Sequence, residues 1–140
     1  VPSGDEGYLT KMRSKIVSRE HLNELGRDLN LIRFVESNYR VNPEKQQRAV
    51  AGLSMGGFHT LHISRYYPNT FDYIGLFSAA IMPREDATGR VYSNFDQTLK
   101  TQQDNGYKLY WIAIGKTDFL YKANQEYLEK LKGMKVIMVG

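Results

Sequence analysis

The sequence of 140 residues contains no cysteine. This absence excludes disulfide bonds, thiolate nucleophiles and zinc sites built on cysteine, and it fits any cellular compartment. Long apolar runs are missing too, and the start of the chain, VPSGDEGYLT, lacks the apolar core of a signal peptide. The chain also has no internal repeat and no low-complexity segment. We therefore expect one globular domain over residues 1–140, with no membrane partner.

A large excess of one charge is also lacking, since the formal net charge is only +4. The most basic stretch, KMRSKIVSR, has no aromatic residues between its charges that would stack on bases, and the chain shows no nucleic-acid-binding motif. A solvated, lysine-rich surface explains this stretch better than a nucleic-acid interface does. We therefore expect no nucleic-acid partner.

A first helix is predicted over residues 18–39. Ser18 suits the N-cap position, and Pro43 ends the helical stretch because proline cannot continue it. Apolar residues recur at spacings of three and four, as on one face of an amphipathic helix: Leu22, Leu25, Leu29, Ile32 and Phe34 or Val35.

Four strands and two further helices are predicted after it. Apolar segments bounded by polar residues indicate strands at 47–53, 71–79, 107–115 and 134–139, the first of them buried, and helices are expected at 55–67 and 122–133. A polar connection over 82–105 carries Tyr92 and Phe95, which could line a substrate site or simply pack onto the body. The alternation of strands and helices predicts an α/β domain, with a mostly parallel sheet and helices on both of its faces.

The segment Gly52-Leu53-Ser54-Met55-Gly56 has the pattern G-x-S-x-G between a predicted strand and a predicted helix. This context is typical of a nucleophile elbow, a sharp turn that raises a serine hydroxyl clear of the sheet. Side chains at Gly52 and Gly56 would collide with neighbouring backbone in such a turn, so glycine is expected at both positions. The N–H of Met55 would lie at a helix N-terminus, where it can stabilise an oxyanion. The alternative is a glycine-rich turn with an incidental serine.

A serine nucleophile needs a base, and an acid that orients the base. At elbows of this kind the order along the chain is serine, acid, histidine. Asp118 follows the third strand and precedes a helix, so it is the candidate acid; the alternative is that it only caps the helix. His21, His59 and His62 all lie upstream of Asp118. We expect these histidines to be structural or surface residues rather than the base.

The stretch RAVAGLSMGGFHTLHISRYYPNTFDYIGLFSAA resembles the elbow region of the putative-esterase family of α/β-hydrolases, especially its feruloyl and acetyl-xylan esterases. IAIGKTDFLY is similar to the acid segment of that family, which places the catalytic acid on Asp118. FVESNYRV resembles the end of the helix that precedes the elbow strand. The resemblance covers most of the chain from about Leu29 onward and implies an α/β-hydrolase fold.

The resemblance implies a serine esterase that cleaves feruloyl or acetyl esters on carbohydrate through an acyl-enzyme on Ser54, without metal or cofactor. Its xylan-active relatives are usually exported, which favours a secreted or periplasmic protein. The catalytic histidine of the family follows the last strand, and the early strands and second oxyanion-hole donor precede the elbow helix. This sequence contains neither part, so we expect a partial α/β-hydrolase domain over residues 1–140 that is inactive alone. An open sheet edge and an uncovered apolar face should make it pair with another chain or aggregate.

Other functions stay open beside this one. S-formylglutathione hydrolases share the S-M-G-G elbow and act on a thioester, while siderophore esterases and mycolyltransferases are more distant. A hydrolase fold without its base could instead be a module that binds carbohydrate and does not cleave it.

Overall fold

The computed structural model of the chain describes residues 31–81, 92–131 and 137–139. Contacts divide the chain into two compact units, residues 1–41 and residues 42–140, which are described separately below. In the described ranges no helix combines the length and the apolar character that a membrane span requires.

The first unit contributes one described helix, α3 (Leu31–Asn38), which Asn38 ends by donating from its side chain to the carbonyl oxygen of Phe34 at 2.8 Å. This confirms the second half of the helix predicted over 18–39, and residues 18–30 lie outside the described residues. The apolar stripe is exposed rather than buried, with Phe34 55% accessible. The described part of this unit contains no other helix or strand on which that stripe could pack.

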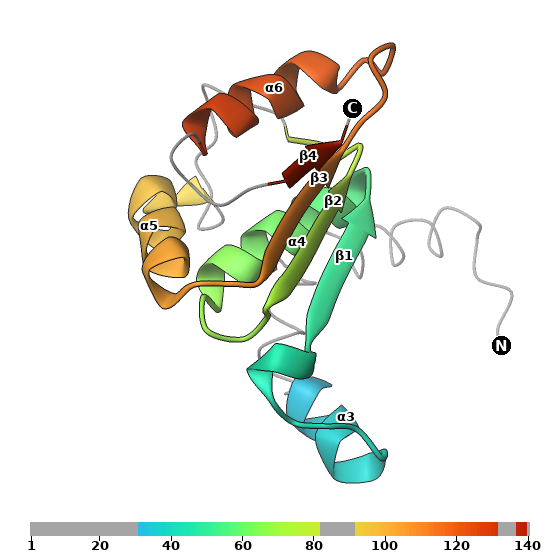
Figure 1. Ribbon diagram of the computed structural model, residues 1–140, viewed down its shortest axis with the longest axis vertical. Coiled ribbons are helices and arrows are strands. Elements are labelled where there is room, and N and C mark those ends of the chain that lie inside the picture. The colour runs from blue at the N-terminus through green and yellow to red at the C-terminus, as the bar shows by residue number, and fades with distance from the viewer. Residues whose placement is uncertain (1–30, 82–91, 132–136, 140) are drawn as a thin grey trace, which may run out of the picture. The chain divides into compact units, whose positions relative to one another are not determined.

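The second unit is a four-stranded parallel sheet in the order β1-β2-β3-β4, with a helix between each pair of strands (Figure 1). A short 3-10 turn, η1, precedes the sheet. The four predicted strands and the two predicted helices are confirmed in type and order, with residues 132–136 outside the described ranges: β1 (Ala49–Leu53), α4 (Met55–Tyr66), β2 (Tyr73–Phe77), β3 (Leu109–Ala113), α6 (Tyr121–Lys130) and β4 (Ile137–Val139). Two elements were not predicted: η1 (Lys45–Gln47), and α5 (Phe95–Asn105), which lies in the stretch expected to be a polar connection.

The three helices of this sheet pack on one face. Because the strands follow one another in a single direction, right-handed crossovers place every connecting helix on the same side. The main core lies there, between the sheet and the three helices, and includes Leu61, Ile74, Leu76, Leu99, Tyr110, Ile112, Tyr127 and Leu131. The expectation of helices on both faces is therefore met for one face only among the described elements of this unit.

The other face of the sheet is accessible to solvent near β1. Leu53 is 68% accessible, and Tyr73 and Phe77 on the neighbouring strand are also exposed. The strand predicted over 47–53 is therefore not buried as expected: within the described sheet β1 is an edge strand whose exposed and half-buried residues alternate. Its uniformly apolar sequence gave no sign of this, because an apolar strand reads the same on either face.

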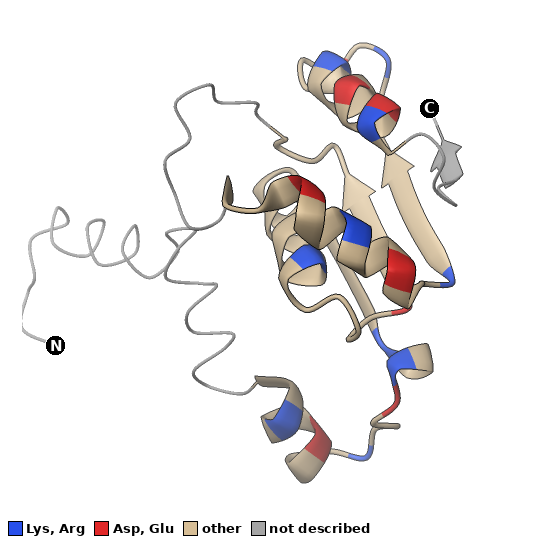
Figure 2. Ribbon diagram, turned by 90° about the vertical axis from the view of Figure 1, so that its left-hand side faces the viewer, with Lys and Arg blue, Asp and Glu red and all other residues tan. Residues whose placement is uncertain are grey.

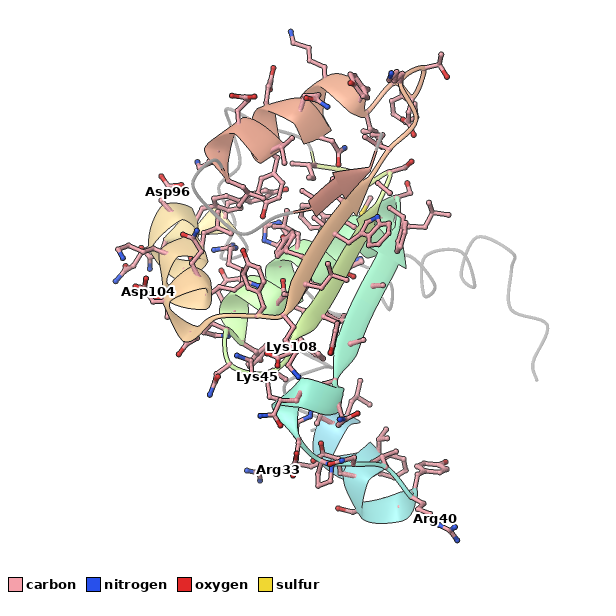
Figure 3. The ribbon with its side chains drawn as sticks, viewed as in Figure 1. Arg33, Arg40, Lys45, Asp96, Asp104 and Lys108 are labelled. Atoms are coloured by element: carbon pink, nitrogen blue, oxygen red, sulfur yellow. The ribbon has the colours of Figure 1, made fainter. Side chains whose placement is uncertain are left out.

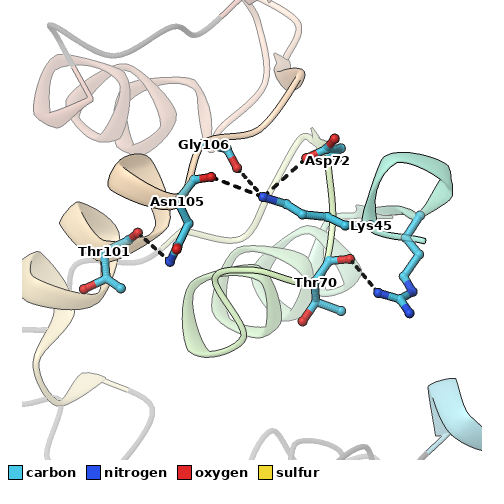
Figure 4. A network of polar contacts seen from close by, with 7 residues as sticks. Lys45, Thr70, Asp72, Thr101, Asn105 and Gly106 are labelled. Carbon is cyan, nitrogen blue, oxygen red and sulfur yellow. Dashed lines mark hydrogen bonds and ion pairs between the residues drawn. The ribbon is translucent and has the colours of Figure 1, made fainter. Parts of the chain in front are cut away.

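A polar clamp joins the amino ends of the strands. The ammonium group of Lys45 donates to the carbonyl oxygen of Gly106 at 2.6 Å and to that of Asn105 at 3.4 Å. It also lies 3.4 Å from a carboxylate oxygen of Asp72, which precedes β2 (Figure 4). The carbonyl oxygen of Asp72 in turn accepts the N–H of Lys108 at 2.9 Å, and Figure 3 shows Lys45 and Lys108 near each other at this end. One lysine thus ties together the segments that lead into β1, β2 and β3.

A buried arginine attaches α4 to α5. The side chain of Arg65 is fully enclosed, and its guanidinium carbon lies 4.6 Å from the ring centroids of both Tyr66 and Phe95. It donates to the hydroxyl of Thr98 and, at 3.1 Å, to Nδ1 of His62. Desolvation by burial lowers the pKa of Arg65 from its usual value. These contacts hold α5 against α4.

The outer surfaces of α5 and α6 mix charges of both signs (Figure 2). Lys130 on α6 pairs with Asp96 on α5 at 2.7 Å, and Lys100 pairs with Asp104 at 3.0 Å. These groups are exposed, and such pairs contribute at most about 1 kcal/mol each. The buried contacts of the two helices therefore hold them in place more than the surface charges do.

Two buried tyrosines bridge β3 and α6. The hydroxyl groups of Tyr110 and Tyr127 are 2.9 Å apart, and both side chains are almost fully enclosed. Burial is the main cause that raises the pKa values of both phenols well above their ordinary range. Both phenols therefore stay protonated in the folded protein under conditions where tyrosines of the unfolded chain ionise.

We expect the protein to lose stability as the pH rises above about 10, where unfolded tyrosine begins to ionise. Because the pKa values are higher in the folded state, the free energy of unfolding is unaffected below that pH. Above it, the free energy of unfolding falls by about 1.4 kcal/mol per pH unit for each buried tyrosine. Replacing both with phenylalanine (Tyr110→Phe with Tyr127→Phe) should flatten this decline, because neither position then carries a phenol that ionises on unfolding. Changing both together also leaves neither hydroxyl buried without its partner. Urea unfolding between pH 8 and 11.5 measures it. Tyr67→Phe, at an exposed position, is the control and should keep the slope of the unchanged chain.

Candidate active site

Ser54 lies in a sharp turn between the end of β1 and the start of α4, as predicted. Its backbone has a φ of 54°, in the left-handed region that non-glycine residues rarely adopt. Its N–H donates to the carbonyl oxygen of Phe77 at 2.9 Å. Its own carbonyl oxygen accepts from the N–H groups of Phe58 at 3.1 Å and Ala80 at 2.9 Å. Three backbone hydrogen bonds therefore hold the serine in this strained conformation, and its side chain is exposed.

Close backbone packing explains the glycine at one of the two predicted elbow positions. A β carbon on Gly52 would stand 2.2 Å from the carbonyl carbon and oxygen of Gly56, a distance that no side chain tolerates. A β carbon on Gly56 would meet nothing within 4 Å, so the steric reason expected for that glycine is wrong. The second tight position is Gly57, whose β carbon would stand 2.6 Å from that of Ala79.

Met55 is the first residue of α4. The N–H groups in the first turn of a helix lie outside its internal hydrogen-bond pattern and carry the positive end of the helix dipole. The predicted position of Met55 at a helix N-terminus is confirmed, and its role as an oxyanion-hole donor stays a prediction.

The carboxyl ends of three strands bring the candidate residues to one edge of the sheet. Leu53, Phe77 and Ala113 are register partners on β1, β2 and β3. Ser54 follows the first of them, and Asp118 follows the third by a short loop. Because neighbouring strands lie about 4.8 Å apart, β1 and β3 are separated by about 10 Å.

Asp118 sits in the turn that leads from β3 into α6. Its Oδ1 accepts the N–H of Leu120 at 2.9 Å, and its own N–H donates to the carbonyl oxygen of Gly115 at 3.0 Å. Among the described residues no group donates to the second carboxylate oxygen, Oδ2. Part of the capping alternative therefore applies, because one oxygen organises the turn ahead of the helix, while the other remains available to a base.

A second polar residue at this edge escaped sequence reasoning. Ser78, directly after β2, has a φ of 40°, and its N–H donates to the carbonyl oxygen of Ala113 at 2.8 Å. It stands beside Ser54 on the neighbouring strand, because Leu53 and Phe77 are register partners. The only available signal was a serine after a predicted strand, which is common in ordinary turns.

The described histidines occupy helix α4 and do not contact the serine hydroxyl. His62 is buried and accepts from Arg65, as expected of a structural residue, and the ring of His59 makes an edge contact with Phe58. His21 lies outside the described residues. In the described ranges the hydroxyl of Ser54 has no hydrogen-bond partner, and no group of His, Asp or Glu side chains is placed to hold a metal ion.

Exposed apolar side chains occur in the segments at the carboxyl ends of the strands. Leu53, Met55, Phe77 and Phe119 are all exposed, with Phe119 86% accessible directly after Asp118. Tyr92 and Phe95 pack instead into the interior, where Tyr92 lies 6.1 Å from Phe58 and Phe95 lies 6.3 Å from Tyr127 between ring centroids. The packing alternative thus describes these two aromatics in the structure.

Comparison with known sequences matches residues 25–138 to the family described as putative esterase. A segment of 56 residues is 43% identical to the endo-1,4-beta-xylanase/feruloyl esterase of Xylanibacter ruminicola, of which it covers 8%. A segment of 38 residues is 90% identical to ribonuclease 3 of Zunongwangia profunda and covers 16% of it.

Two solved structures share the fold. A ferulic acid esterase aligns with a TM-score of 0.62 at 20% identity, over 83% of this chain and 52% of its own. The S-formylglutathione hydrolase of Staphylococcus aureus aligns with a TM-score of 0.68 at 18% identity, over 88% of this chain and 57% of its own. The chain thus spans little more than half the length of these esterase structures.

Gly52→Ala should destabilise the protein by about 3 kcal/mol or more, because its β carbon has no room beside the Gly56 carbonyl. Gly56→Ala is the matched control: it places a methyl group in open space within a helix and should be neutral or stabilising by up to about 1 kcal/mol. Urea unfolding midpoints distinguish them. Equal effects of the two substitutions would contradict the steric account of the elbow.

Proposed function

Because this chain belongs to the putative-esterase family, we propose that it is a serine esterase acting through an acyl-enzyme on Ser54. The observation that carries the proposal is the strained backbone of Ser54, with a φ of 54°, between a parallel strand and a helix N-terminus. Strain of this kind costs free energy, and it persists at sites where the conformation has a use. The match of residues 25–138 to this family supports the coarser proposal of a hydrolase of the esterase class.

In the proposed reaction Ser54 Oγ attacks the ester carbonyl carbon while a histidine accepts the hydroxyl proton. The N–H of Met55 and a second donor stabilise the oxyanion that forms. Collapse of this adduct breaks the bond to the alcohol, which takes the proton from the imidazolium. Water then attacks the acyl-enzyme in the same way and releases the carboxylic acid. Asp118 orients the histidine through Oδ2, the carboxylate oxygen that does not accept from Leu120.

We propose that the base histidine and the second oxyanion donor come from parts of the polypeptide beyond residues 1–140. The chain spans 52% and 57% of the two similar structures, which leaves much of such a fold to other segments. The absence of a hydrogen-bond partner for the Ser54 hydroxyl among the described residues agrees with this proposal. No metal or cofactor takes part in it.

The proposed substrate is a carboxylic ester on carbohydrate, of the feruloyl or acetyl type. The relative from Xylanibacter ruminicola and the similar ferulic acid esterase support this class. The exposed apolar side chains beside Ser54, Phe77 and Phe119 among them, suit an aromatic acyl group, because aromatic rings pack well against one another.

A thioesterase acting on S-formylglutathione is the second candidate, favoured by the similarity to the S-formylglutathione hydrolase structure. A carbohydrate-binding module without catalysis is the third. The ribonuclease similarity adds no activity to this proposal, because it covers 16% of that enzyme.

Ser54→Ala in the polypeptide that contains this chain should lower ester hydrolysis by a factor of about 10⁴ or more, because the covalent route is then lost. Rates on methyl ferulate, acetylated xylan and S-formylglutathione measure this loss and identify the substrate class. Ser37→Ala, at an exposed serine of α3, is the matched control and should keep the full rate. Cleavage of none of the three, with retained binding of xylan, would favour the binding module.

We also propose that residues 1–140, taken alone, pair with another chain through β1. The strand is an edge strand of the described sheet, and the face beside it exposes Leu53, Tyr73 and Phe77. Light scattering after size-exclusion chromatography of this chain should therefore show dimers or larger species. A dispersed monomer at micromolar concentration would contradict the proposal.

A further inference from the structure

The geometry points to Asn124 as the positioning residue that sets the separation of Ser54 and Asp118. This inference rests on the proposed function and adds to it a residue that does not touch the substrate. Asn124 lies in the first turn of α6, and its side chain is completely buried.

Both amide protons of Asn124 are used in hydrogen bonds to backbone carbonyl groups. Nδ2 donates to the oxygen of Ala79 at 2.9 Å and to that of Leu120 at 3.0 Å. The two acceptors lie far apart in the sequence, one after β2 and the other after β3. A single side chain therefore joins the two loops on the carboxyl side of neighbouring strands.

On one side the connection reaches the candidate acid. Leu120 accepts from Asn124 through its carbonyl oxygen and donates its N–H to Oδ1 of Asp118 at 2.9 Å. The backbone N–H of Asn124 also donates to the Leu120 carbonyl, at 3.0 Å. Both backbone groups of Leu120 are therefore hydrogen-bonded, its N–H to the carboxylate of Asp118 and its C=O to Asn124.

On the other side the connection reaches the nucleophile. The peptide group between Ala79 and Ala80 accepts from Asn124 through its C=O and donates through its N–H to the carbonyl oxygen of Ser54 at 2.9 Å. Ala79 is also the residue against which Gly57 packs closely. An unbroken series of hydrogen bonds therefore runs from Ser54 through one peptide group, one amide and one leucine to Asp118.

The chemistry of this position requires an amide. Two carbonyl oxygens face the side chain, so only a group with two N–H donors can satisfy both. The orientation leaves Oδ1 buried without a hydrogen-bond partner among the described residues. A buried acceptor without a donor destabilises the folded state, and the two hydrogen bonds that Nδ2 makes to the loops offset this loss. A carboxylate of the same shape would instead place oxygen against oxygen.

The test is Asn124→Asp in the polypeptide that contains this chain, assayed on the ester that it cleaves. We expect kcat to fall by about ten- to a hundredfold with KM changed less than about twofold, because a small displacement of the acid mainly affects the reacting geometry. Combined with Asp118→Asn, the substitution should cause no further loss, since Asn124 acts through Asp118. Thermal unfolding confirms that each variant is folded at the assay temperature.

Asn105→Asp is the matched control, because its exposed amide also donates to a helix carbonyl, that of Thr101 at 3.0 Å. It should keep kcat unchanged. A folded Asn124→Asp variant with full kcat, or losses that multiply with those of Asp118→Asn, would overturn the inference. If Asn124→Asp does not fold, Asn124→Ala is judged by the same criteria, and failure of both to fold assigns the residue a structural role only. Full activity of Ser54→Ala would instead refute the proposed function itself.

Discussion

The carbonyl group of Gly56 occupies the space where a side chain on Gly52 would lie, and the path of the chain through the elbow follows from this contact. The end of β1 and the first turn of α4 pass very close to each other. Ser54, between them, has a positive φ of 54°. The hydrogen bonds of Ser54 to Phe77 and Ala80 then anchor the turn to the neighbouring strand. The position of the hydroxyl, the helix N-terminus and the loop after β2 all depend on this single lack of space.

Polar groups at the two ends of the sheet differ in how far their hydrogen bonds are satisfied. At the amino ends, Lys45 joins three segments through backbone carbonyls and Asp72, and nearly all of its hydrogen-bonding capacity is used. At the carboxyl ends, Ser54 is exposed and Asp118 keeps one oxygen without a donor among the described residues. Parallel sheets commonly bind ligands beyond the carboxyl ends of their strands, and this division agrees with that rule.

The four strands, the helices α4 and α6 and the elbow could be predicted from the sequence because they leave local signals, whereas α5 is a polar helix whose stretch shows no clear apolar period. Apolar periodicity located the strands and helices, and the glycine spacing located Ser54, since these patterns reflect contacts between residues close in sequence. The exposure of β1 and the true tight partner of the elbow, Gly57 with Ala79, depend on contacts between distant segments. Asn124 stayed unnoticed for the same reason: a polar residue in a polar helix gives no sign that its amide joins two loops.

The conformation of Ser54 also has a consequence for the evolution of the fold. A φ of 54° is a region that glycine occupies at little cost, whereas serine is disfavoured there by about 1–3 kcal/mol. Selection for stability alone would therefore drive this position towards glycine and remove the hydroxyl. Under the proposed function, the serine at this position is a compromise between stability and activity, in which the fold is less stable than its own backbone would permit.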